Sequence, residues 1–190
     1  MRGYISCAPG DVIGDRARIV VTLIPHRGYA PAAPSDFCGD IAGTSVIDRG
    51  RFRDIPAVAR LQRRCFRRSL AYRPSTLFAL YLWPRASFLV ARSGSQIVGC
   101  VIGDVHAGQS RVISICVDPG WRRRGIGDRL MAQIENDLTA GNIILMVESG
   151  NDAAERMYRQ RGYMPVGESR DYYGRGRSGT WMQKSRTATG

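Results

Sequence analysis

The stretch that decides the fold is VISICVDPGWRRRGIGDRLMAQIENDL, residues 112–138. It opens with a β-branched run that predicts a buried strand. The Asp118-Pro119-Gly120 turn ends this run, because proline cannot donate a hydrogen bond to a sheet ladder. Beyond the turn, apolar residues recur at helical spacing with polar residues between them, which predicts an amphipathic helix facing a core. The apolar stripe of that helix consists of Ile126, Leu130, Met131, Ile134 and Leu138.

The loop between this strand and this helix has the sequence RRRGIG, residues 122–127. Glycine lets a ligand approach the backbone closely, and the first amides of a helix have no intrahelical partner, so together they can bind an anion. Three arginines add charge suited to phosphate. A Gly-x-Gly pair is also found at ordinary helix starts beside a solvated basic turn. The order of strand, loop and helix favours the phosphate-binding interpretation.

The pattern Arg122-x-x-Gly125-x-Gly127, preceded by ICVDPGW, resembles the acetyl-CoA pyrophosphate loop of the GNAT-type N-acetyltransferases. In that family the pattern is Gln or Arg, two residues, Gly, one residue, then Gly or Ala. Residues 142–167 are similar to the family's next strand, its Asn-containing turn and its Tyr-bearing helix. With the later segment DYYGRGRSGTWMQK, the order and spacing most resemble the ribosomal-protein N-terminal alanine acetyltransferases. The resemblance covers roughly residues 45–185.

This resemblance implies an α/β fold with a central, mixed, twisted sheet of about six to seven strands flanked by about four helices. It also implies a V-shaped splay between the fourth and fifth strands. Acetyl-CoA would lie in that opening as the cosubstrate, with its pantetheine arm bonded to free backbone groups like an added strand, and no metal would be needed. The implied cosubstrate contacts are Ile115, Cys116, Val117, Arg122, Arg123, Arg124, Gly125, Ile126, Gly127, Asp128 and Asn151.

Two residues are candidates for proton transfer. Tyr158 aligns with the family tyrosine beside the cosubstrate sulfur, where it would donate a proton to the departing CoA thiolate; the alternative is a core aromatic residue. The glutamates that serve as bases in relatives are replaced here by Met146 and Arg111, neither of which can accept a proton. Glu148 shares a strand face with Met146 and could act through a water molecule, or could simply be an exposed strand end.

The expected reaction moves an acetyl group from acetyl-CoA to a primary amine, most simply the N-terminal α-amine of a protein or peptide. Tyr172 and Tyr173 resemble the paired tyrosines that close over the peptide in N-terminal acetyltransferases. A small amine, such as a polyamine or an aminoglycoside, is an alternative acceptor. A noncatalytic acyl-CoA-sensing or RNA- or ribosome-associated module is an alternative of another class.

Composition adds weaker constraints. The 190 residues carry a formal net charge of +12, which is compatible with a position near RNA or the ribosome. Lys184 is the only lysine, so part of the arginine excess reflects a bias in codon composition. Five cysteines without paired or metal-binding spacing predict a reducing, cytoplasmic environment. No apolar run reaches the ~18 residues of a membrane-spanning helix. Both a monomer and a homodimer remain open.

The chain divides into three parts. Residues 1–44 match nothing in the resemblance and are expected to be a flexible extension, a start site placed too far upstream, or a partner-binding arm, with one possible strand at residues 18–24. Residues 45–186 form the expected N-acetyltransferase domain, and residues 187–190 are a tail. Within the domain we expect strands at 45–49, 87–91, 96–105, 112–117, 144–148, 163–169 and 180–184, and helices from about 54, at 74–83, from about 126 and at 152–162. Tyr72, Phe78 and Tyr81, near the second helix, are expected in the core rather than in an acceptor pocket.

Overall fold

The computed structural model describes residues 20–21 and 45–186. The predictions for residues 1–19, 22–44 and the tail 187–190 lie outside the described residues. The strands are β1 (Val20–Val21), β2 (Val46–Arg49), β3 (Ala86–Ser93), β4 (Gln96–His106), β5 (Gln109–Val117), β6 (Ile143–Glu148), β7 (Met164–Ser169) and β8 (Gly179–Lys184). The helices are α1 (Ile55–Cys65), α2 (Pro74–Leu82), α3 (Ile126–Asp137) and α4 (Asp152–Gln160), with short 3-10 turns η1 (Phe52–Asp54) and η2 (Pro119–Trp121).

These strands form one mixed sheet in the order β2-β3-β4-β5-β1-β6-β8-β7. Strands β2 to β5 are antiparallel neighbours, and β6, β8 and β7 form a second antiparallel group. The two groups are joined by parallel pairing of β5 with β6. Seven strands belong to residues 45–186 and β1 is the eighth, so the predicted mixed sheet flanked by four helices is confirmed.

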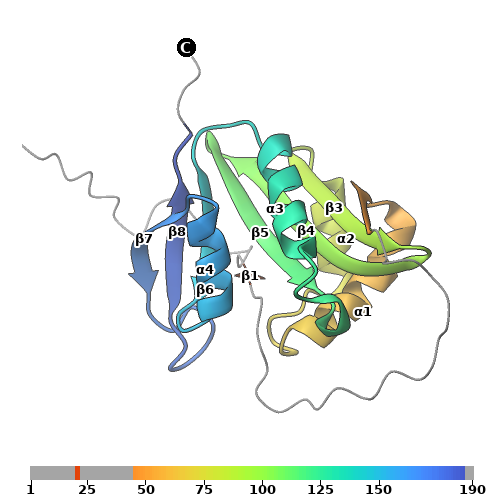
Figure 1. Ribbon diagram of the computed structural model, residues 1–190, viewed down its shortest axis with the longest axis horizontal. Helices are drawn as coiled ribbons and strands as arrows, with labels where there is room; N and C mark the ends of the chain where they lie inside the picture. The colour runs from red at the N-terminus through yellow and green to blue at the C-terminus, as the bar shows by residue number, and fades with distance from the viewer. Residues whose placement is uncertain (1–19, 22–44, 187–190) are drawn as a thin grey trace, which may run out of the picture.

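Strands β5 and β6 pair over a short distance only. Their register partners are Ser110 with Ile143 and Arg111 with Ile144, both at the beginning of the strands. Beyond these pairs the strands diverge, and β1 lies between them (Figure 1). This opening separates the fourth and fifth strands of the domain, which confirms the predicted V-shaped splay. The two residues of β1 also confirm part of the strand predicted at residues 18–24.

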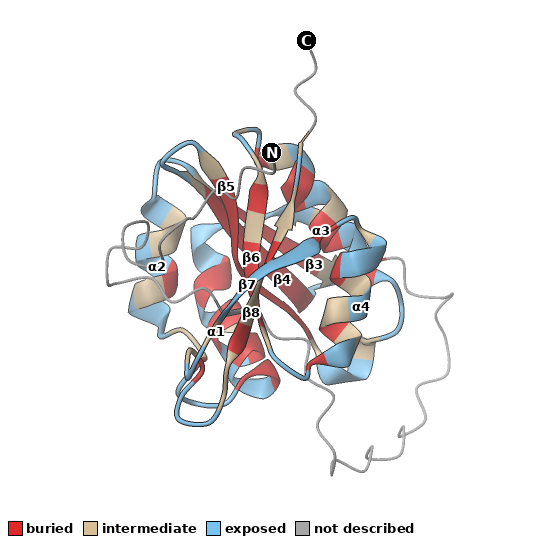
Figure 2. Ribbon diagram, turned by 90° about the vertical axis from the view of Figure 1, so that its left-hand side faces the viewer, coloured by how far each residue is buried: buried red, intermediate tan, exposed pale blue. Residues whose placement is uncertain are grey.

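The four helices cover both faces of the sheet. Figure 2 shows α1 and α2 on one face and α3 and α4 on the other. All five residues of the predicted apolar stripe of α3 are buried against the sheet. Strand β4 admits this close packing through Gly103, where a Cβ atom would lie 2.7 Å from Leu138 and 2.8 Å from the carbonyl oxygen of Arg111. No helix among the described residues is long and apolar enough to cross a bilayer.

One core prediction is wrong. Phe78 on α2 is 41% exposed and packs edge-on against Phe52, which is itself exposed, with ring centroids 5.5 Å apart. Its helix is amphipathic only weakly, and a single residue, Leu77, is buried fully. Tyr72 and Tyr81 are partly buried and pack against the core, as expected. Periodicity therefore identified the helix but not the face that it buries.

Candidate active site

A cleft of about 630 Å³ lies where the beginning of α3 faces α4. One wall is the end of β5 and the loop that follows it, and the other wall is one side of α4. The two walls come from the two separate halves of the sheet, so the cleft continues the opening between β5 and β6. Its lining residues are Val117, Trp121, Arg122, Arg123, Gly125, Ile126, Gly127, Asp128, Ala153, Arg156, Met157 and Gln160.

The loop wall has the backbone geometry of an anion site. Gly125 is the residue before the first turn of α3 and has φ +71°, in the left-handed region that favours glycine. A Cβ atom at Gly125 would meet nothing within 4 Å, so its free side is open. The first amides of α3 follow directly, without partners inside the helix. Positive charge from Arg122 and Arg123 stands beside them, as a phosphate requires.

Two loop arginines also hold the loop in shape. The guanidinium of Arg124 lies 4.8 Å from the ring centroid of Trp121 and outside the cleft lining, so its main contact is a cation–π interaction. Arg122 donates from Nε to the carbonyl oxygen of Val117 at 3.2 Å. The loop is therefore tied back to the end of β5.

The predicted backbone contacts Ile115, Cys116 and Val117 do not all face the same side of β5. The amide of Asp118 donates to the carbonyl of Val98 on β4, at 2.8 Å. Because backbone groups alternate sides along a strand, Cys116 also turns its N–H and C=O toward β4, whereas Ile115 and Val117 turn theirs toward the opening. The predicted backbone contact at Cys116 is therefore corrected: Cys116 lies beside the site without facing it.

Asn151 caps the beginning of α4, and its side-chain amide has one bonded atom and one unbonded atom. Its side-chain oxygen accepts from the amide of Ala154 at 3.4 Å, which is the ordinary capping role. Its side-chain nitrogen is buried and has no hydrogen-bond partner among the described residues. A buried donor left unpaired costs free energy, so its presence indicates a site for a ligand's acceptor atom. The capping interpretation is confirmed, and the contact of Asn151 with acetyl-CoA stays a prediction.

Tyr158 is a buried phenol without a partner. Its hydroxyl has no hydrogen-bond partner among the described residues, and its ring packs edge-on against Tyr163 with centroids 5.7 Å apart. Burial raises the pKa of Tyr158 well above its usual value, and the nearby Tyr163 adds to the shift. The phenol therefore stays protonated at neutral pH and keeps a proton to donate. Tyr158 is not among the residues that line the cleft, although its chain neighbour Met157 is.

The two tyrosines predicted to close over the acceptor occupy different environments. Tyr173 is buried and donates from its hydroxyl to the carbonyl of Met146 on β6, at 2.9 Å. Tyr172 is partly exposed and packs against Trp181, with centroids 6.1 Å apart. Burial raises the pKa of Tyr72, and the charge of Tyr172 adds to the shift, so these two rings are neighbours. Of the two rings, that of Tyr172 is the more exposed, and its contact with an acceptor stays a prediction.

Neither the candidate base Glu148 nor either of the residues at the two positions where relatives carry a glutamate is an isolated proton acceptor. Both oxygens of Glu148 accept from Arg177, at 2.6 and 2.7 Å, and Arg177 also donates to the carbonyl of Tyr173. Arg111 forms a buried two-point ion pair with Asp104 on β4, at 2.8 and 2.6 Å. Met146 is buried. The geometry thus gives Glu148 a role in holding the β7–β8 loop, and its service as a base stays a prediction.

Sequence reasoning missed the α4 wall of the cleft. The four residues that line it are spaced three and four positions apart, as one side of a helix requires. Among them Arg156 brings a further positive charge toward the loop arginines. The helical spacing was visible in the sequence, but the face of α4 that meets α3 depends on packing between elements. The four residues are Ala153, Arg156, Met157 and Gln160.

Comparison with known proteins gives a family and two relatives. Residues 55–163, which include every residue that lines the cleft, match the acetyltransferase (GNAT) family. The chain is 36% identical over 94 residues to the N-alpha-acetyltransferase RimI of Mycobacterium tuberculosis, and the match covers 47% of this chain and 60% of that protein. It is 28% identical over 138 residues to an uncharacterized N-acetyltransferase of Methanocaldococcus jannaschii, covering 70% of this chain and 87% of that one.

Solved structures confirm the architecture. The crystal structure of the ribosomal-protein-S18-alanine N-acetyltransferase from Escherichia coli superposes with a TM-score of 0.69 at 20% sequence identity. The superposition covers 77% of this chain and 97% of that one. At this identity the likeness establishes the shared fold.

Proposed function

This chain belongs to the acetyltransferase (GNAT) family, and from that premise we propose that it transfers an acetyl group from acetyl-CoA to the α-amine of a protein or peptide. The observation that carries the proposal is the cleft of about 630 Å³ between the arginine-glycine loop and α4. It combines Arg122, Arg123 and Arg156 with the amides at the start of α3 and with Val117 at the end of β5. A long ligand with phosphates at one end suits this shape.

The described residues fit acetyl-CoA at three points. Arg122, Arg123 and the first amides of α3 would hold the pyrophosphate, and Arg156 faces them from the other wall. The free side-chain nitrogen of Asn151 would donate to the pantetheine arm. The backbone groups of Ile115 and Val117 that face the opening would bind the same arm as a neighbouring strand binds.

Strand β1 supports this use of the opening. Val20 pairs in parallel with Ser114, and Val21 pairs with both Ile115 and Val147. The edges of β5 and β6 therefore accept an extended chain between them. Because Ile115 is also a proposed contact of the pantetheine arm, β1 and acetyl-CoA compete for one place, and binding would displace β1.

Acetyl-CoA, when bound, supplies an activated acetyl thioester. The amine nitrogen of the neutral acceptor forms a bond to the acetyl carbon, the carbon–sulfur bond breaks, and the nitrogen releases one proton to water while the sulfur leaves as the thiol of CoA. We assign the backbone amide of Val117, which faces the opening, to the developing oxyanion. Tyr158 keeps its proton at neutral pH and would donate it to the departing sulfur.

The ion pair of Glu148 bears on the acceptor. Met146 cannot accept a proton, and each oxygen of Glu148 accepts a hydrogen bond from Arg177, which weakens Glu148 as a base. Without a base the reaction depends on acceptor that is already neutral. A protein α-amine has a pKa of about 8 and a lysine side chain about 10.4, so at neutral pH the α-amine supplies far more of the neutral form. We therefore favour an N-terminal acceptor, with Tyr172 beside its path.

Location and partners follow from weaker observations. The three described cysteines, Cys65, Cys100 and Cys116, are free thiols, and the sulfurs of Cys100 and Cys116 share a hydrogen bond of 3.4 Å without a disulfide. This state suits a reducing compartment, and we propose the cytoplasm. Exposed arginines on α1 and in the turn directly after it could bring the chain near ribosomal RNA; they are Arg60, Arg63, Arg64, Arg67 and Arg68.

One experiment tests the reaction and the acceptor class together. Radiolabelled acetyl-CoA is offered in parallel to short peptides with free N-termini, to polyamines and to aminoglycosides. The proposal expects label on the peptides. Label confined to the small amines would show that a small amine, and not a peptide, is the acceptor. Tight acetyl-CoA binding without label on any acceptor would favour a noncatalytic acyl-CoA-binding module.

A further inference from the structure

The sheet connects the two walls of the cleft only through short pairings of β5 with β6 and of β1 with both. The loop wall and α3 belong to the β2–β5 half, whereas α4 belongs to the β6–β8 half. The backbone of the domain joins these halves through only two register pairs of β5 and β6. A ligand that spans the cleft requires a fixed separation of its walls, because binding at both ends is strong only when the geometry permits both at once.

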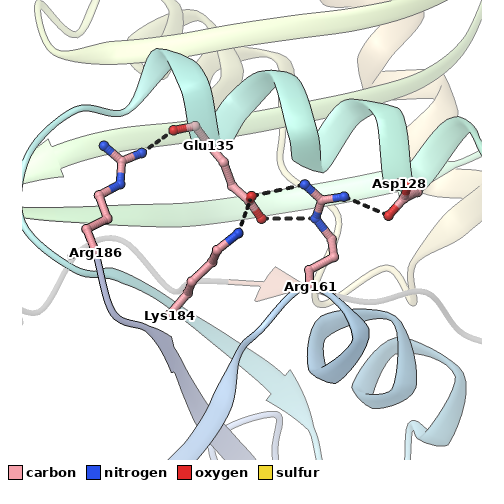
Figure 3. A network of polar contacts seen from close by, with 5 residues as sticks. All are labelled: Asp128, Glu135, Arg161, Lys184 and Arg186. Carbon is pink, nitrogen blue, oxygen red and sulfur yellow. Dashed lines mark hydrogen bonds and ion pairs between the residues drawn. The ribbon is translucent and has the colours of Figure 1, made fainter. Parts of the chain in front are cut away.

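A network of charged side chains crosses between the walls (Figure 3). Arg161, directly after α4, donates to Asp128 on the first turn of α3 at 2.7 Å. The same guanidinium donates to both oxygens of Glu135, two turns further along α3, at 3.0 Å each. Lys184 on β8 donates to Glu135 at 2.8 Å, and Arg186 donates to the carbonyl oxygen of Glu135.

The strongest part of this network is sheltered from water. Glu135 is 7% exposed, and the side chain of Arg161 is 15% exposed, whereas that of Asp128 is 60% exposed. Burial alone would raise the pKa of Glu135, but hydrogen bonds from Arg161 and Lys184 outweigh it and hold the pKa below its usual value. Glu135 is therefore ionised at neutral pH. A two-point arginine–carboxylate pair has one preferred geometry, so it fixes distance and angle together.

The position of Arg161 connects both ends of the proposed ligand. Its amide bonds back to the carbonyls of Met157 and Tyr158, at 3.2 and 3.0 Å, so Arg161 moves with the turn of α4 that carries Tyr158. Its partner Asp128 follows Gly127 in the opposite wall of the cleft. One guanidinium thus joins the phosphate-binding end of the site to the residue beside the thioester.

We propose that Arg161 is a positioning residue, which sets the separation between the arginine-glycine loop and Tyr158 so that the pyrophosphate and the thioester of acetyl-CoA bind together. This role rests on the proposed function. It assigns to Arg161 no contact with acetyl-CoA; the residue acts through α3 and α4.

The test compares a long ligand with a short one. Acetyl-CoA reaches from the loop to Tyr158, whereas adenosine 3′-phosphate 5′-diphosphate ends at the pyrophosphate. Calorimetric titration of Arg161→Met should show acetyl-CoA weakened about tenfold and the short ligand changed less than about twofold. The matched control is Arg159→Met in the last turn of α4, where the side chain of Arg159 makes a 3.9 Å surface pair with Glu155 as its one ion pair among the described residues. It should bind both ligands as the wild type does.

Other outcomes overturn the role. Equal weakening of both ligands would show that Arg161 acts on the loop alone, and unchanged affinity for acetyl-CoA would show that the network does not set the separation. If Arg161→Met does not fold, Arg161→Lys retains a charge beside Glu135 and should show the same selective loss to a smaller degree. A wild-type chain that binds neither ligand would instead refute the proposed function.

Discussion

Replacing Gly125 by valine tests the cleft directly. Gly125 has φ +71°, and a side chain there costs about 1–2 kcal/mol in the left-handed region. For a domain of this size, each kcal/mol lowers Tm by about 3 °C, so we expect a loss of about 3–6 °C. The new side chain also stands in the cleft lining, next to the first amides of α3. We expect calorimetric affinity for acetyl-CoA to fall at least tenfold, or about 1.4 kcal/mol.

A matched control separates strain from binding. Gly94, in the turn between β3 and β4, has φ +55°, and a Cβ atom there would likewise meet nothing within 4 Å. It takes no part in the cleft. Gly94→Val should therefore lower Tm by a similar amount and leave the affinity for acetyl-CoA unchanged. If a folded Gly125→Val variant binds acetyl-CoA as tightly as the wild type does, the arginine-glycine loop is not the phosphate site.

Three further predictions follow from the same structure. Tyr158→Phe should lower kcat and leave acetyl-CoA affinity nearly intact, since the ring still packs and only the hydroxyl is lost; an unchanged kcat would remove Tyr158 from the chemistry. A chain that begins at Ser45 should fold and bind acetyl-CoA at least as tightly as the full chain, because β1 no longer competes; weaker binding or loss of cooperative melting would show that residues 1–44 support the domain. Because the pKa of Glu135 is lowered in the folded state, its contribution to stability is complete above the unfolded value of about 4.3 and is lost as pH falls through the folded pKa. In denaturant melts, the free energy of unfolding of Glu135→Gln should therefore lie below that of the wild type at pH 7, and the two values should converge in acid. A difference between them that grows on acidification would contradict the ion-pair account.

The local parts of the site were predictable from sequence because local physics determines them. The strand before Pro119, the glycine at position 125 and the apolar stripe of α3 all lie within one continuous stretch. Each depends on neighbours a few residues away. In these three elements the structure changed the extents, for example by extending β5 back to Gln109.

The remaining features depend on contacts between distant residues. Glu148 is 29 positions from Arg177, and no periodicity indicates that the two pair. Tyr173 is buried beneath β6 although its neighbour Tyr172 is accessible, because the loop folds back onto Met146. Arg161 and Glu135 are 26 positions apart and meet only when α3 and α4 lie on the same face of the sheet. Such pairs require the assembled fold.

The most direct test of the central claim uses one peptide with two amines. The peptide carries a free N-terminal alanine and a single internal lysine, and mass spectrometry follows acetyl transfer from acetyl-CoA at neutral pH. Because Met146 cannot accept a proton and Glu148 is paired with Arg177, the account relies on acceptor that is already neutral and predicts faster acetylation of the α-amine. Faster acetylation of the lysine, or no enzymatic transfer to either amine, would contradict it.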